Sequence, residues 1–433
     1  MIPGQDGGAV TEAAGGPFEP PVHRADTHEN ILLASEIAVN TERLYASPVT
    51  TPRATGDDEL RQEILATVSR FVANEVVPVA SALEREDRFP AEIVDAMRDL
   101  GLFGVTIPEA YGGLGLDLVT YVGIIEELAY GWMSLTGIVN THTLAATLLM
   151  AHGTEEQKRR WLPAMARGEW RGALSLSEPD AGSDTNALAC RAVRDGEEFV
   201  LNGTKAWVTN GERAGIVALA ARTDKGISAF VVEKEPGPSF EGITVGKHVD
   251  KLGYRGVETV EMIYVDHRIP ATNLIGEEGR GLAQILGVLE VGRINIAARA
   301  TGVARAAFDA AMAYARQRTT FGKPIAEHQA IAMKLADMAT RLEASHLLTE
   351  SAARRKMAGE RCDVEAGMAK VFASETAMEL ATEAMRIHGA VGYTTELPVE
   401  RYFRDAPLMM IGEGTNEIQR LVIARGLLTR ARS

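Results

Sequence analysis

The middle of the chain carries the segment Phe199-Val200-Leu201-Asn202-Gly203-Thr204-Lys205-Ala206-Trp207-Val208, in which apolar and β-branched residues surround an Asn-Gly pair. Asn-Gly is typical of two-residue hairpin turns because both residues tolerate positive φ. We therefore predict two strands that are joined by a turn at Asn202-Gly203. Further short β-rich runs occur at residues 216–219, 229–232 and 262–265. Together these runs predict a small β domain over residues 173–282.

Helical patterns lie on the N-terminal side of this β region. Apolar residues recur at helical spacing from about Asp57, and the pattern stops at Pro78, so the first helix is expected to end there. Pro90 stands where the first residue of a second helix belongs, and Gly101 can cap the end of that helix. Further helices are expected around residues 117–130 and 140–152. Residues 58–172 are therefore predicted to form an α-helical domain.

The sequence after Gly281 has a helical period up to the last residues. Ile331, Leu335 and Met338 step by four and three, which is typical of a seam in a helix bundle, so these side chains are assigned to a core. Four long helices fit, around residues 283–316, 325–357, 364–388 and 416–430. The predicted fold class is α+β, with an N-terminal α-helical domain, a small β domain and a C-terminal four-helix bundle over residues 283–433.

Composition limits the classes of function that suit this chain. Its 433 residues are enough for about three domains. The 59 acidic and 45 basic side chains give a net charge of −14. Because affinity for nucleic acid comes largely from Lys and Arg contacts to phosphate, we expect no nucleic acid partner. The two cysteines, Cys190 and Cys362, provide neither a disulfide framework nor metal-ligand spacing, so no metal site is expected.

Residues 1–57 are rich in Gly, Pro, Thr and Ala and are expected to form an N-terminal extension, in part without regular structure. They contain no basic segment followed by an apolar one, so no signal peptide is predicted. No later segment reaches the ~18 consecutive apolar residues of a membrane helix. We therefore expect a cytoplasmic protein that does not insert into membranes.

Several common cofactor and catalytic fingerprints are missing from the sequence. It has no G-x-G-x-x-G after a strand, no G-x-x-x-x-G-K-[ST], no H-E-x-x-H and no G-x-S-x-G. Nicotinamide, P-loop, zinc-protease and hydrolase chemistry therefore lose their main sequence support. Any redox cofactor must be held in another way.

Three loop-like segments combine small, flexible residues with carboxylates or hydroxyls. They are residues 176–184, 205–211 and 411–420. Each alone also fits an ordinary structural part: the first a turn, Trp207 a core side chain, and Thr415 or Asn416 a helix cap. Gly412-Glu413-Gly414 is the most informative, because the flanking glycines let a ligand approach closely and a partly desolvated Glu can become a general base.

These three segments, in this order and at this spacing, closely resemble the acyl-CoA dehydrogenase family of flavoproteins. The resemblance covers roughly residues 58–430 and extends to further motifs at residues 317–325, 386–393 and 401–406. The α-helical, β and bundle regions also occur in the order of that family's fold. The resemblance implies an FAD-dependent enzyme of fatty acid β-oxidation, which converts an acyl-CoA thioester to the trans-2-enoyl-CoA.

The resemblance also implies which carboxylate is the catalytic base. In that family a carboxylate removes the α-proton of the thioester while N5 of FAD accepts the β-hydride, and the matching carboxylate is Glu413. Hydrogen-bond donors, among them the backbone N–H of that Glu, hold the developing enolate charge. One branch of the family carries its base immediately before an Arg that corresponds to Arg293. That position is Gly292 here, so Glu413 is expected to serve.

Contacts to the cofactor and the substrate follow from the same resemblance. Arg318 fits a partner for the FAD phosphates, although alone it would be a solvated charge at a helix end. Some FAD contacts in that family cross a subunit interface, so a homotetramer or dimer is expected. The implied cofactor-binding residues are Leu174, Leu176, Ser177, Gly182, Ser183, Trp207, Val208, Thr209, Arg318, Phe321, His328, Gln329, Arg386, Ile387, His388, Gly389, Thr415, Asn416 and Glu417. The implied substrate-binding residues are Ser183, Glu290, Arg293 and Gly414.

Three positions depart from the pattern of the family. Arg386 stands where many relatives have Gln, and Ala390 stands where they have Gly, which leaves the local phosphate geometry open. Gly412 is often bulky in relatives. Its small size here leaves room near the α-carbon of the substrate and favours a branched or bulky acyl group.

The expected electron acceptor is an electron-transfer flavoprotein. Two alternatives stay open: an oxidase on the same scaffold that is reoxidised by O2, and a non-catalytic or DNA-associated flavoprotein of this fold. The acidic net charge and the intact Glu413 argue against the second. Asn140-Thr141-His142-Thr143 forms a polar patch on an apolar helix, for which a satisfied core network is favoured over contact with a polar acyl tail.

Overall fold

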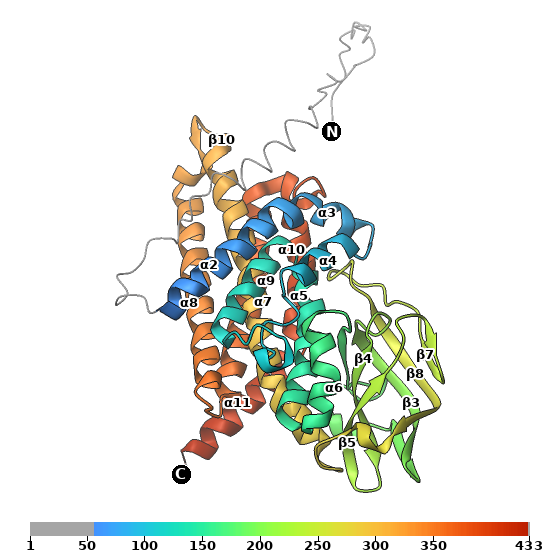
Figure 1. Ribbon diagram of the computed structural model, residues 1–433. Coiled ribbons are helices and arrows are strands. Elements are labelled where there is room, and N and C mark those ends of the chain that lie inside the picture. The colour runs from blue at the N-terminus through green and yellow to red at the C-terminus, as the bar shows by residue number, and fades with distance from the viewer. Residues whose placement is uncertain (1–55, 432–433) are drawn as a thin grey trace, which may run out of the picture. The chain divides into compact units, whose positions relative to one another are not determined.

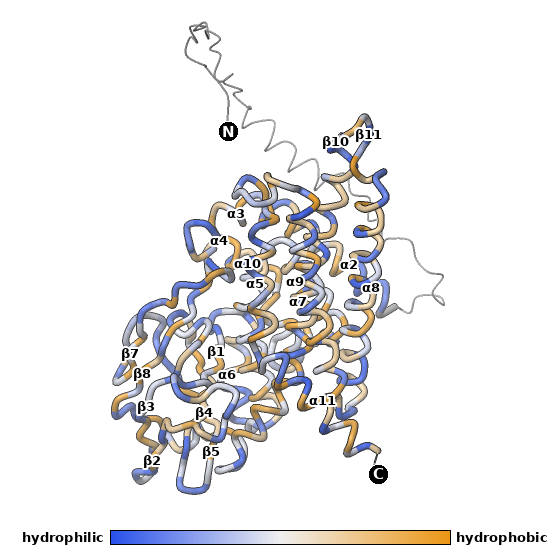
Figure 2. The backbone as a smooth tube through the Cα atoms, turned by 180° about the vertical axis from the view of Figure 1, so that it is seen from behind, coloured by the Kyte–Doolittle hydropathy of each residue, from blue (hydrophilic) through white to orange (hydrophobic). Residues whose placement is uncertain are grey.

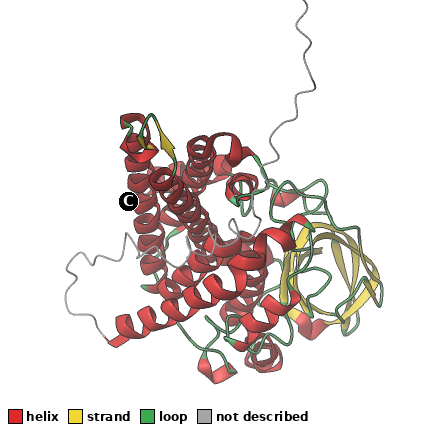
Figure 3. Cartoon of the chain, turned by 90° about the horizontal axis from the view of Figure 1, so that it is seen from above, coloured by secondary structure: helices red, strands yellow, loops and turns green. Residues whose placement is uncertain are grey.

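The computed structural model of the protein describes residues 56–431, so the predicted extension over residues 1–57 lies almost wholly outside the described residues. A helical region, a β region and a second helical region follow one another along the chain (Figure 1). This order confirms the predicted α+β fold class. Seen from above, the strands of the β region gather on one side of the helices (Figure 3).

The first helical pattern does not end at Pro78, as the sequence predicted. Helix α2 (Gly56–Phe71) continues into one π-helical turn, η1 (Val72–Val76), and then into α3 (Val77–Arg85). Pro78 lies in the first turn of α3, where a helix tolerates a residue without an N–H group. The wider π turn before it lets the chain change hydrogen-bonding pattern without leaving the helix.

Two further helices and a long one complete the N-terminal region. Helix α4 (Ala91–Asp99) follows Pro90, and Gly101 after it has a φ of +73°, as predicted. One helix, α5 (Leu118–His152), replaces the two that were expected, with a non-helical backbone at Trp132 (φ −158°, ψ 109°). Helix α6 (Glu155–Ala166) begins at a capping box.

Within residues 56–431 the β region forms one sheet of nine strands. Its main path has the order β6-β7-β8-β3-β2-β4-β5-β9, and β1 pairs with β4 in parallel. The strands are β1 (Gly172–Ser175), β2 (Arg191–Asp195), β3 (Glu198–Thr209), β4 (Ile216–Thr223), β5 (Gly226–Glu233), β6 (Ser239–Phe240), β7 (Ile243–Val245), β8 (Thr259–Pro270) and β9 (Leu274–Ile275).

Asn202-Gly203 does not form the predicted hairpin turn. Both residues lie inside β3, where the register with β8 shifts between Leu201 and Gly203. Gly203 has a φ of +147°, and a Cβ on it would lie 2.7 Å from Cα of Cys190, the residue directly before the neighbouring β2. The pair is therefore a bulge at which two backbones approach closely. The actual hairpin turn is at Gly196, between β2 and β3, where φ is +62°.

The C-terminal region contains the four predicted long helices and one more. They are α7 (Gly281–Gln317), α8 (Gln329–Met357), α9 (Asp363–His388) and α11 (Asn416–Arg430), with the unpredicted α10 (Val399–Ile411) before the last. Helix α8 begins four residues later than expected, because residues 325–327 form a 3-10 turn. The hairpin of β10 (Thr319–Thr320) and β11 (Lys323–Pro324) lies at the end of the bundle away from the C-terminus (Figure 2).

Apolar packing joins these regions around α5. One core cluster contains Ile125 of α5 together with Ile294 of α7, so the two helical regions share a core. A second cluster joins Leu148 of α5 and Trp161 of α6 to one face of the sheet. A third cluster, which includes Phe199 of β3, lies on the other face.

Among the residues that the structure describes, two helical segments, Asp58–Arg85 and Gly281–Gln317, are long and apolar enough to cross a membrane. Charged residues such as Glu290 and Arg293 interrupt the apolar run in the second segment, so it was not predicted as a membrane helix. In that segment 67% of the apolar window is buried inside the protein, as in a core helix, compared with 28% in the first.

Candidate active site

Glu413 lies in the short loop between α10 and α11. Its backbone has a φ of +57°, and that of Gly414 has a φ of +86°. The left-handed conformation is rare for a residue with a Cβ, and here it turns the chain between two helices. Thr415 caps α11, because its Oγ1 accepts a hydrogen bond from Ile418 N at 3.3 Å.

A buried lysine, Lys370 of α9, holds this loop. Its Nζ donates to the carbonyl oxygen of Gly414 at 3.0 Å and to Oδ1 of Asn416 at 2.8 Å. From the other side, Gln419 Nε2 donates to the carbonyl oxygen of Glu413 at 3.2 Å. Because these donors satisfy the polar groups of the loop, they fix the backbone from which the Glu413 side chain starts.

The two oxygens of the Glu413 carboxylate have different surroundings. Asn140 of α5 donates a hydrogen bond to Oε1. Oε2 is buried and has no hydrogen-bond partner among the described residues. Gly292 of α7 leaves the space for it, since a Cβ at that position would lie 1.7 Å from Oε2. One oxygen is thus held in place, and the other is available to accept a proton.

Burial and nearby charges act on Glu413 in opposite directions. Burial raises the pKa of the Glu413 carboxyl above its usual range. The hydrogen bond from Asn140 and the positive charges of Arg299, Arg293 and Lys370 lower this pKa. A buried carboxylate whose charge is supported by cations is the arrangement that a general base requires.

The polar patch on α5 serves two purposes. Thr141 Oγ1 accepts a hydrogen bond from Leu174 N at 2.9 Å, and both ring nitrogens of His142 have backbone partners. These two residues belong to a core network, which the sequence analysis favoured. Asn140 instead contacts Glu413, which lies 273 residues away in the sequence.

A buried ion pair joins the first two predicted cofactor segments. Lys205 Nζ lies 2.7 Å from Glu178 Oε1, with side chains 0% and 6% exposed. The same Nζ donates to the carbonyl oxygen of Leu176 at 2.9 Å, and Ala206 N donates to that of Ser177 at 2.9 Å. The loop after β1 and the end of β3 therefore form one unit.

Trp207 is exposed although it lies in a strand. Its φ is +62° and its side chain is 64% exposed, whereas Val208 beside it is buried and Thr209 is half-buried. The register between β3 and β8 shifts here, so the bulge turns the indole outward. Gly182 and Ser183 are exposed as well. The unit formed by the loop after β1 and the end of β3 thus exposes an aromatic side chain and two small residues.

A second group of predicted cofactor residues lies at the far end of the bundle. Phe321, at the tip of the β10–β11 hairpin, is 97% exposed, and its ring meets that of His328 edge to face at 5.9 Å. His388, at the end of α9, stacks on Tyr314 of α7 at 4.3 Å. Around them Arg318, Gln329, Arg386 and Gly389 are exposed and Ile387 is buried. The α7 helix separates Arg318 from Gly292 by about 39 Å at 1.5 Å per residue.

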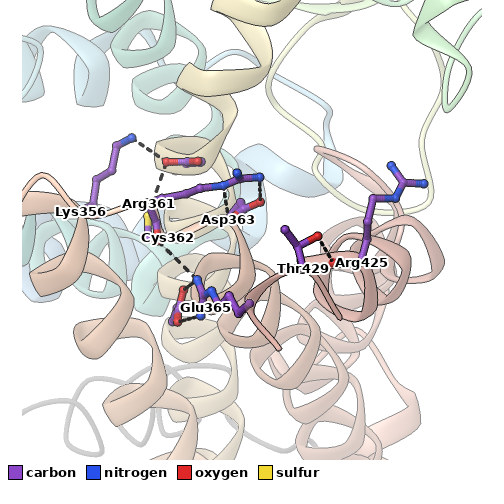
Figure 4. A network of polar contacts seen from close by, with 9 residues as sticks. Lys356, Arg361, Cys362, Asp363, Glu365, Arg425 and Thr429 are labelled. Atoms are coloured by element: carbon purple, nitrogen blue, oxygen red, sulfur yellow. Dashed lines mark hydrogen bonds and ion pairs between the residues drawn. The ribbon is translucent and has the colours of Figure 1, made fainter. Parts of the chain in front are cut away.

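Glu290 and Arg293, the predicted CoA contacts, have different surroundings. Lys356 Nζ lies 2.6 Å from Glu290 Oε2, and Cys362 Sγ donates to the same oxygen at 3.5 Å. Lys356 and Cys362 belong to a polar network that also includes Arg361 (Figure 4). Arg293 is 8% exposed, and its Nε has no partner among the described residues.

Asn416 and Glu417 differ in burial and in their hydrogen bonds. The amide of Asn416 is 3% exposed and is used within the protein, since it also bonds to Ser374 and Glu375. Glu417 is exposed on the first turn of α11. Asn416 therefore supports the loop, while Glu417 faces solvent.

Sequence reasoning missed three buried polar residues in this region. Arg299 Nη2 donates to Asn295 Oδ1 at 3.0 Å, and Asn295 Nδ2 donates to the hydroxyl of Tyr121 at 2.9 Å. They come from α7 and α5 and belong to no recognised motif. Within the part of the chain that the structure describes, no group of three or more His, Cys, Asp or Glu could hold a metal ion.

Comparison with known proteins covers nearly the whole described chain. The N-terminal, middle and C-terminal domains of acyl-CoA dehydrogenase match residues 58–169, 173–266 and 279–428. The mitochondrial short-chain specific acyl-CoA dehydrogenase of Bos taurus is 44% identical over 382 residues, which are 87% of this chain and 92% of that one.

Two solved structures have the same fold over most of their length. Butyryl-CoA dehydrogenase from Megasphaera elsdenii superimposes with a TM-score of 0.83 at 36% identity, covering 87% of this chain and 100% of that one. A structure described under the electron transferring flavoprotein of Acidaminococcus fermentans gives 0.82 at 38% identity, covering 87% and 99%. The chain therefore belongs to the acyl-CoA dehydrogenase family, the FAD-dependent flavoprotein oxidoreductases that act on acyl-CoA.

Proposed function

We propose that this chain oxidises a short-chain acyl-CoA to the trans-2-enoyl-CoA, with Glu413 as the base that removes the α-proton. The observation that carries the proposal is the buried Oε2 of Glu413, which has no partner among the described residues. The match to short-chain specific and butyryl-CoA dehydrogenases supports a short acyl chain.

The residues around Glu413 suit proton removal beside a thioester. Such a proton is weakly acidic, so the base needs a raised pKa and the developing enolate needs hydrogen-bond donors. Burial raises the pKa of Glu413, while Asn140 keeps Oε1 oriented. The backbone N–H of Glu413 is the expected donor to the thioester oxygen. Lys370 and Gln419 hold that backbone in place.

The unit formed by the loop after β1 and the end of β3 suits the flavin of FAD. The exposed indole of Trp207 offers a face for stacking, and a Cβ on Gly182 would meet no atom within 4 Å, so a ring can approach closely. We assign Leu174, Leu176, Ser177, Ser183, Val208 and Thr209 to the same site. When bound, FAD supplies the acceptor for the hydride that leaves the β-carbon.

The cofactor contacts at the far end of the bundle are proposed to serve a second subunit. Arg318 lies about 39 Å along α7 from Gly292, so it cannot serve the cofactor beside Glu413 of its own chain. A homotetramer or dimer that shares sites explains why Phe321 is almost fully exposed. Oligomers mixed from Glu413→Gln chains and Arg318→Ala chains are then expected to regain activity, because one intact site forms between them. Mixtures that stay inactive would contradict shared sites.

We assign Arg293 and Glu290 to the CoA moiety and an electron-transfer flavoprotein to the role of electron acceptor. Arg293 is a buried cation next to the base, which suits an anionic thioester carrier. The likeness to the Acidaminococcus fermentans structure described under its electron transferring flavoprotein supports that acceptor. A cytoplasmic location without membrane insertion, and the absence of a nucleic acid partner, stay predictions.

The test is anaerobic mixing of the FAD-loaded protein with butyryl-CoA. Bleaching of the flavin band is expected, and Glu413→Gln should slow it about 10²- to 10⁴-fold while FAD content is kept. Glu63→Gln, an exposed residue on α2, is the matched control and should bleach as the wild type does. Failure of straight-chain thioesters of any length to bleach the flavin would remove the proposal. Rapid reoxidation by air with release of H2O2 would favour the oxidase alternative.

A further inference from the structure

Three oxygen atoms accept hydrogen bonds from the ammonium group of Lys370 in α9. Its Nζ donates to the carbonyl oxygen of Met410 at 3.1 Å, to that of Gly414 at 3.0 Å and to Oδ1 of Asn416 at 2.8 Å. The lysine is 0% exposed, so bulk water does not replace a lost partner. A lysine ammonium has three N–H donors and no acceptor. Donors and acceptors therefore match in number.

These acceptors lie at both ends of the loop that carries Glu413. Met410 is the second-last residue of α10, Gly414 lies in the loop, and Asn416 is the first residue of α11. A cation is also favoured at the C-terminal end of a helix such as α10, where unpaired carbonyl groups carry partial negative charge. One buried nitrogen thus ties the end of α10, the loop and the start of α11 to α9.

This arrangement requires the proton on Lys370. A neutral amine keeps two N–H donors and gains a lone pair, so one of the three oxygens would lose its donor and face that lone pair. A buried acceptor without a donor is unfavourable, and the loop relieves this by moving. A shift of about 1 Å between reacting groups lowers a rate about 100-fold. Deprotonation of Lys370 is therefore expected to slow proton removal by Glu413.

The charges that face Lys370 come from several elements. Burial lowers the pKa of the Lys370 ammonium to about 8. The negative charges of Glu413 in the loop, Glu417 on α11 and Glu375 on α9 oppose this decrease. The positive charge of Arg293 on α7 adds to it. The proton is therefore lost in a pH range in which the enzyme can be assayed.

We propose that Lys370 is a positioning residue whose protonated form holds the loop so that Glu413 reaches the α-carbon of the substrate. The inference rests on the proposed function and adds to it a second ionisable group that acts through Glu413. Removal of the α-proton should then require both an ionised Glu413 and a protonated Lys370, which gives the rate an acid limb and an alkaline limb.

The test measures the rate of flavin bleaching by saturating butyryl-CoA under anaerobic conditions, from pH 6 to pH 10, in the FAD-loaded protein. The wild-type rate should fall as pH rises through about 8, the pKa of Lys370. The dissociation constant of butyryl-CoA should change less than about threefold, because the base and not the substrate site is displaced. A primary isotope effect with α-deuterated butyryl-CoA identifies proton removal as the step that is measured.

Two variants separate the charge of Lys370 from its packing. Lys370→Arg keeps its positive charge throughout this range, so its rate should stay level to pH 10 and, at pH 7, remain above about a tenth of the wild-type rate. Lys370→Met removes all three donors. Its rate at pH 7 should be about 100-fold lower, without an alkaline limb and with a nearly unchanged dissociation constant for butyryl-CoA.

Lys234, which follows β5, is the matched control. Its Nζ donates to three carbonyl oxygens as well, those of Glu212, Ala214 and Glu235, at 2.8, 3.2 and 3.0 Å. It is 5% exposed, and burial lowers its pKa to about 8. Lys234→Met should lower the melting temperature but keep both the alkaline limb and the wild-type rate per bound FAD.

Hydrogen exchange of residues 410–419 at pH 7 measures the loop without turnover. Exchange should be faster in Lys370→Met than in the wild type and unchanged in Lys234→Met, since only the first variant removes donors from this loop. Equal exchange in all three proteins would overturn the inference, whether or not the flavin is bleached.

The kinetic results decide the rest. A wild-type rate that stays level to pH 10, or an alkaline limb that persists in Lys370→Arg and Lys370→Met, would overturn the inference and leave the proposed function intact. A limb that disappears in Lys234→Met would overturn it as well, because the titrating group would then lie in the β region. If butyryl-CoA bleaches the flavin at no pH, the proposed function fails, and hydrogen exchange still tests whether Lys370 holds the loop.

Discussion

Gly292 and Glu413 are 121 positions apart in the chain, yet a Cβ on Gly292 would lie 1.7 Å from Oε2 of the Glu413 carboxylate. Because Gly292 on α7 has no side chain, the Glu413 carboxylate from the loop after α10 can occupy the space beside it. A carboxylate at position 292 and one at position 413, the two places where the family carries its base, would therefore occupy the same space.

Replacement of Gly292 by alanine should displace the carboxylate. We expect kcat to fall about 100-fold or more, because a shift of about 1 Å in a reacting group costs that much. Gly287→Ala on the same helix is the control, since a Cβ there meets no atom within 4 Å. Steady-state kinetics and thermal unfolding separate a displaced base from a general loss of stability. Equal losses in both variants would contradict the assignment.

Moving the carboxylate from position 413 to position 292 should restore part of the activity. Glu413→Gly removes the carboxylate, and Gly292→Glu in the same chain returns one from the α7 side into the volume that was vacated. The double variant is expected to be at least about tenfold more active than Glu413→Gly alone, since general base catalysis is worth about 10²- to 10⁴-fold. A double variant no better than the single one would show that α7 cannot present the base.

Asn140→Leu should move the acid limb of the pH–rate profile upward. The hydrogen bond from Asn140 lowers the pKa of Glu413, so its loss leaves the effect of burial less opposed and the base protonated up to a higher pH. The measurement is kcat/KM from pH 5 to 9. Thr147→Ala, on a half-buried position of the same helix, should leave the limb where it is. An unchanged limb in Asn140→Leu would mean that this hydrogen bond does not govern the ionisation.

Lys205→Met should destabilise the protein by about 3–5 kcal/mol and lower its FAD content, because it leaves the buried Glu178 carboxylate without its cation. Denaturant unfolding and flavin absorbance measure the two effects. Lys225→Met is the control: its pair with Glu278 is 2.9 Å long, but its side chain is 70% exposed, so a loss below about 1 kcal/mol is expected. If Lys205→Met is less stable but keeps its full FAD content, the Lys205–Glu178 pair does not contribute to cofactor binding.

The His346–Glu126 contact should make stability depend on pH. The charge of Glu126 raises the pKa of His346 to about 9, so the contact stabilises the protein fully below pH 6.5 and is lost as pH rises through about 9. The side chain of His346 is 45% exposed, so the effect should stay near 1 kcal/mol. Urea unfolding of wild type and His346→Gln at pH 6 and pH 10 measures it. The two proteins should differ at pH 6 and agree at pH 10, and a difference that persists at pH 10 would point to packing instead.

The order of helical, β and helical regions could be predicted from periodicity, because each element repeats its own local pattern. The fold prediction was wrong where a local sequence pattern is compatible with two different structures. Asn202-Gly203 suits a hairpin turn as well as a bulge, and the close backbone of Cys190 selects the bulge. Pro78 suits the end of one helix as well as the first turn of the next, and the π turn before it selects the second.

Candidate site residues could be proposed from the sequence where a motif is continuous. Glu413 and Trp207 lie in such segments, and the structure gives both the unusual backbone that a functional position often has. Arg299 and Lys370 were out of reach, because each is a single polar residue in an otherwise ordinary helix, and Asn140 was noticed only as part of a polar patch that was assigned to a core network. Their significance arises from distances across the fold that no local pattern contains.

Three of the predicted site residues, Trp207, Phe321 and Glu413, share a positive φ with few other non-glycine residues among those described. Each departs from the preferred backbone by about 1 kcal/mol. Selection for stability alone would replace these residues with glycine, and the protein would then melt at a higher temperature and work less well. Under the proposed function, the chain gives up some stability at three positions of its base and cofactor segments.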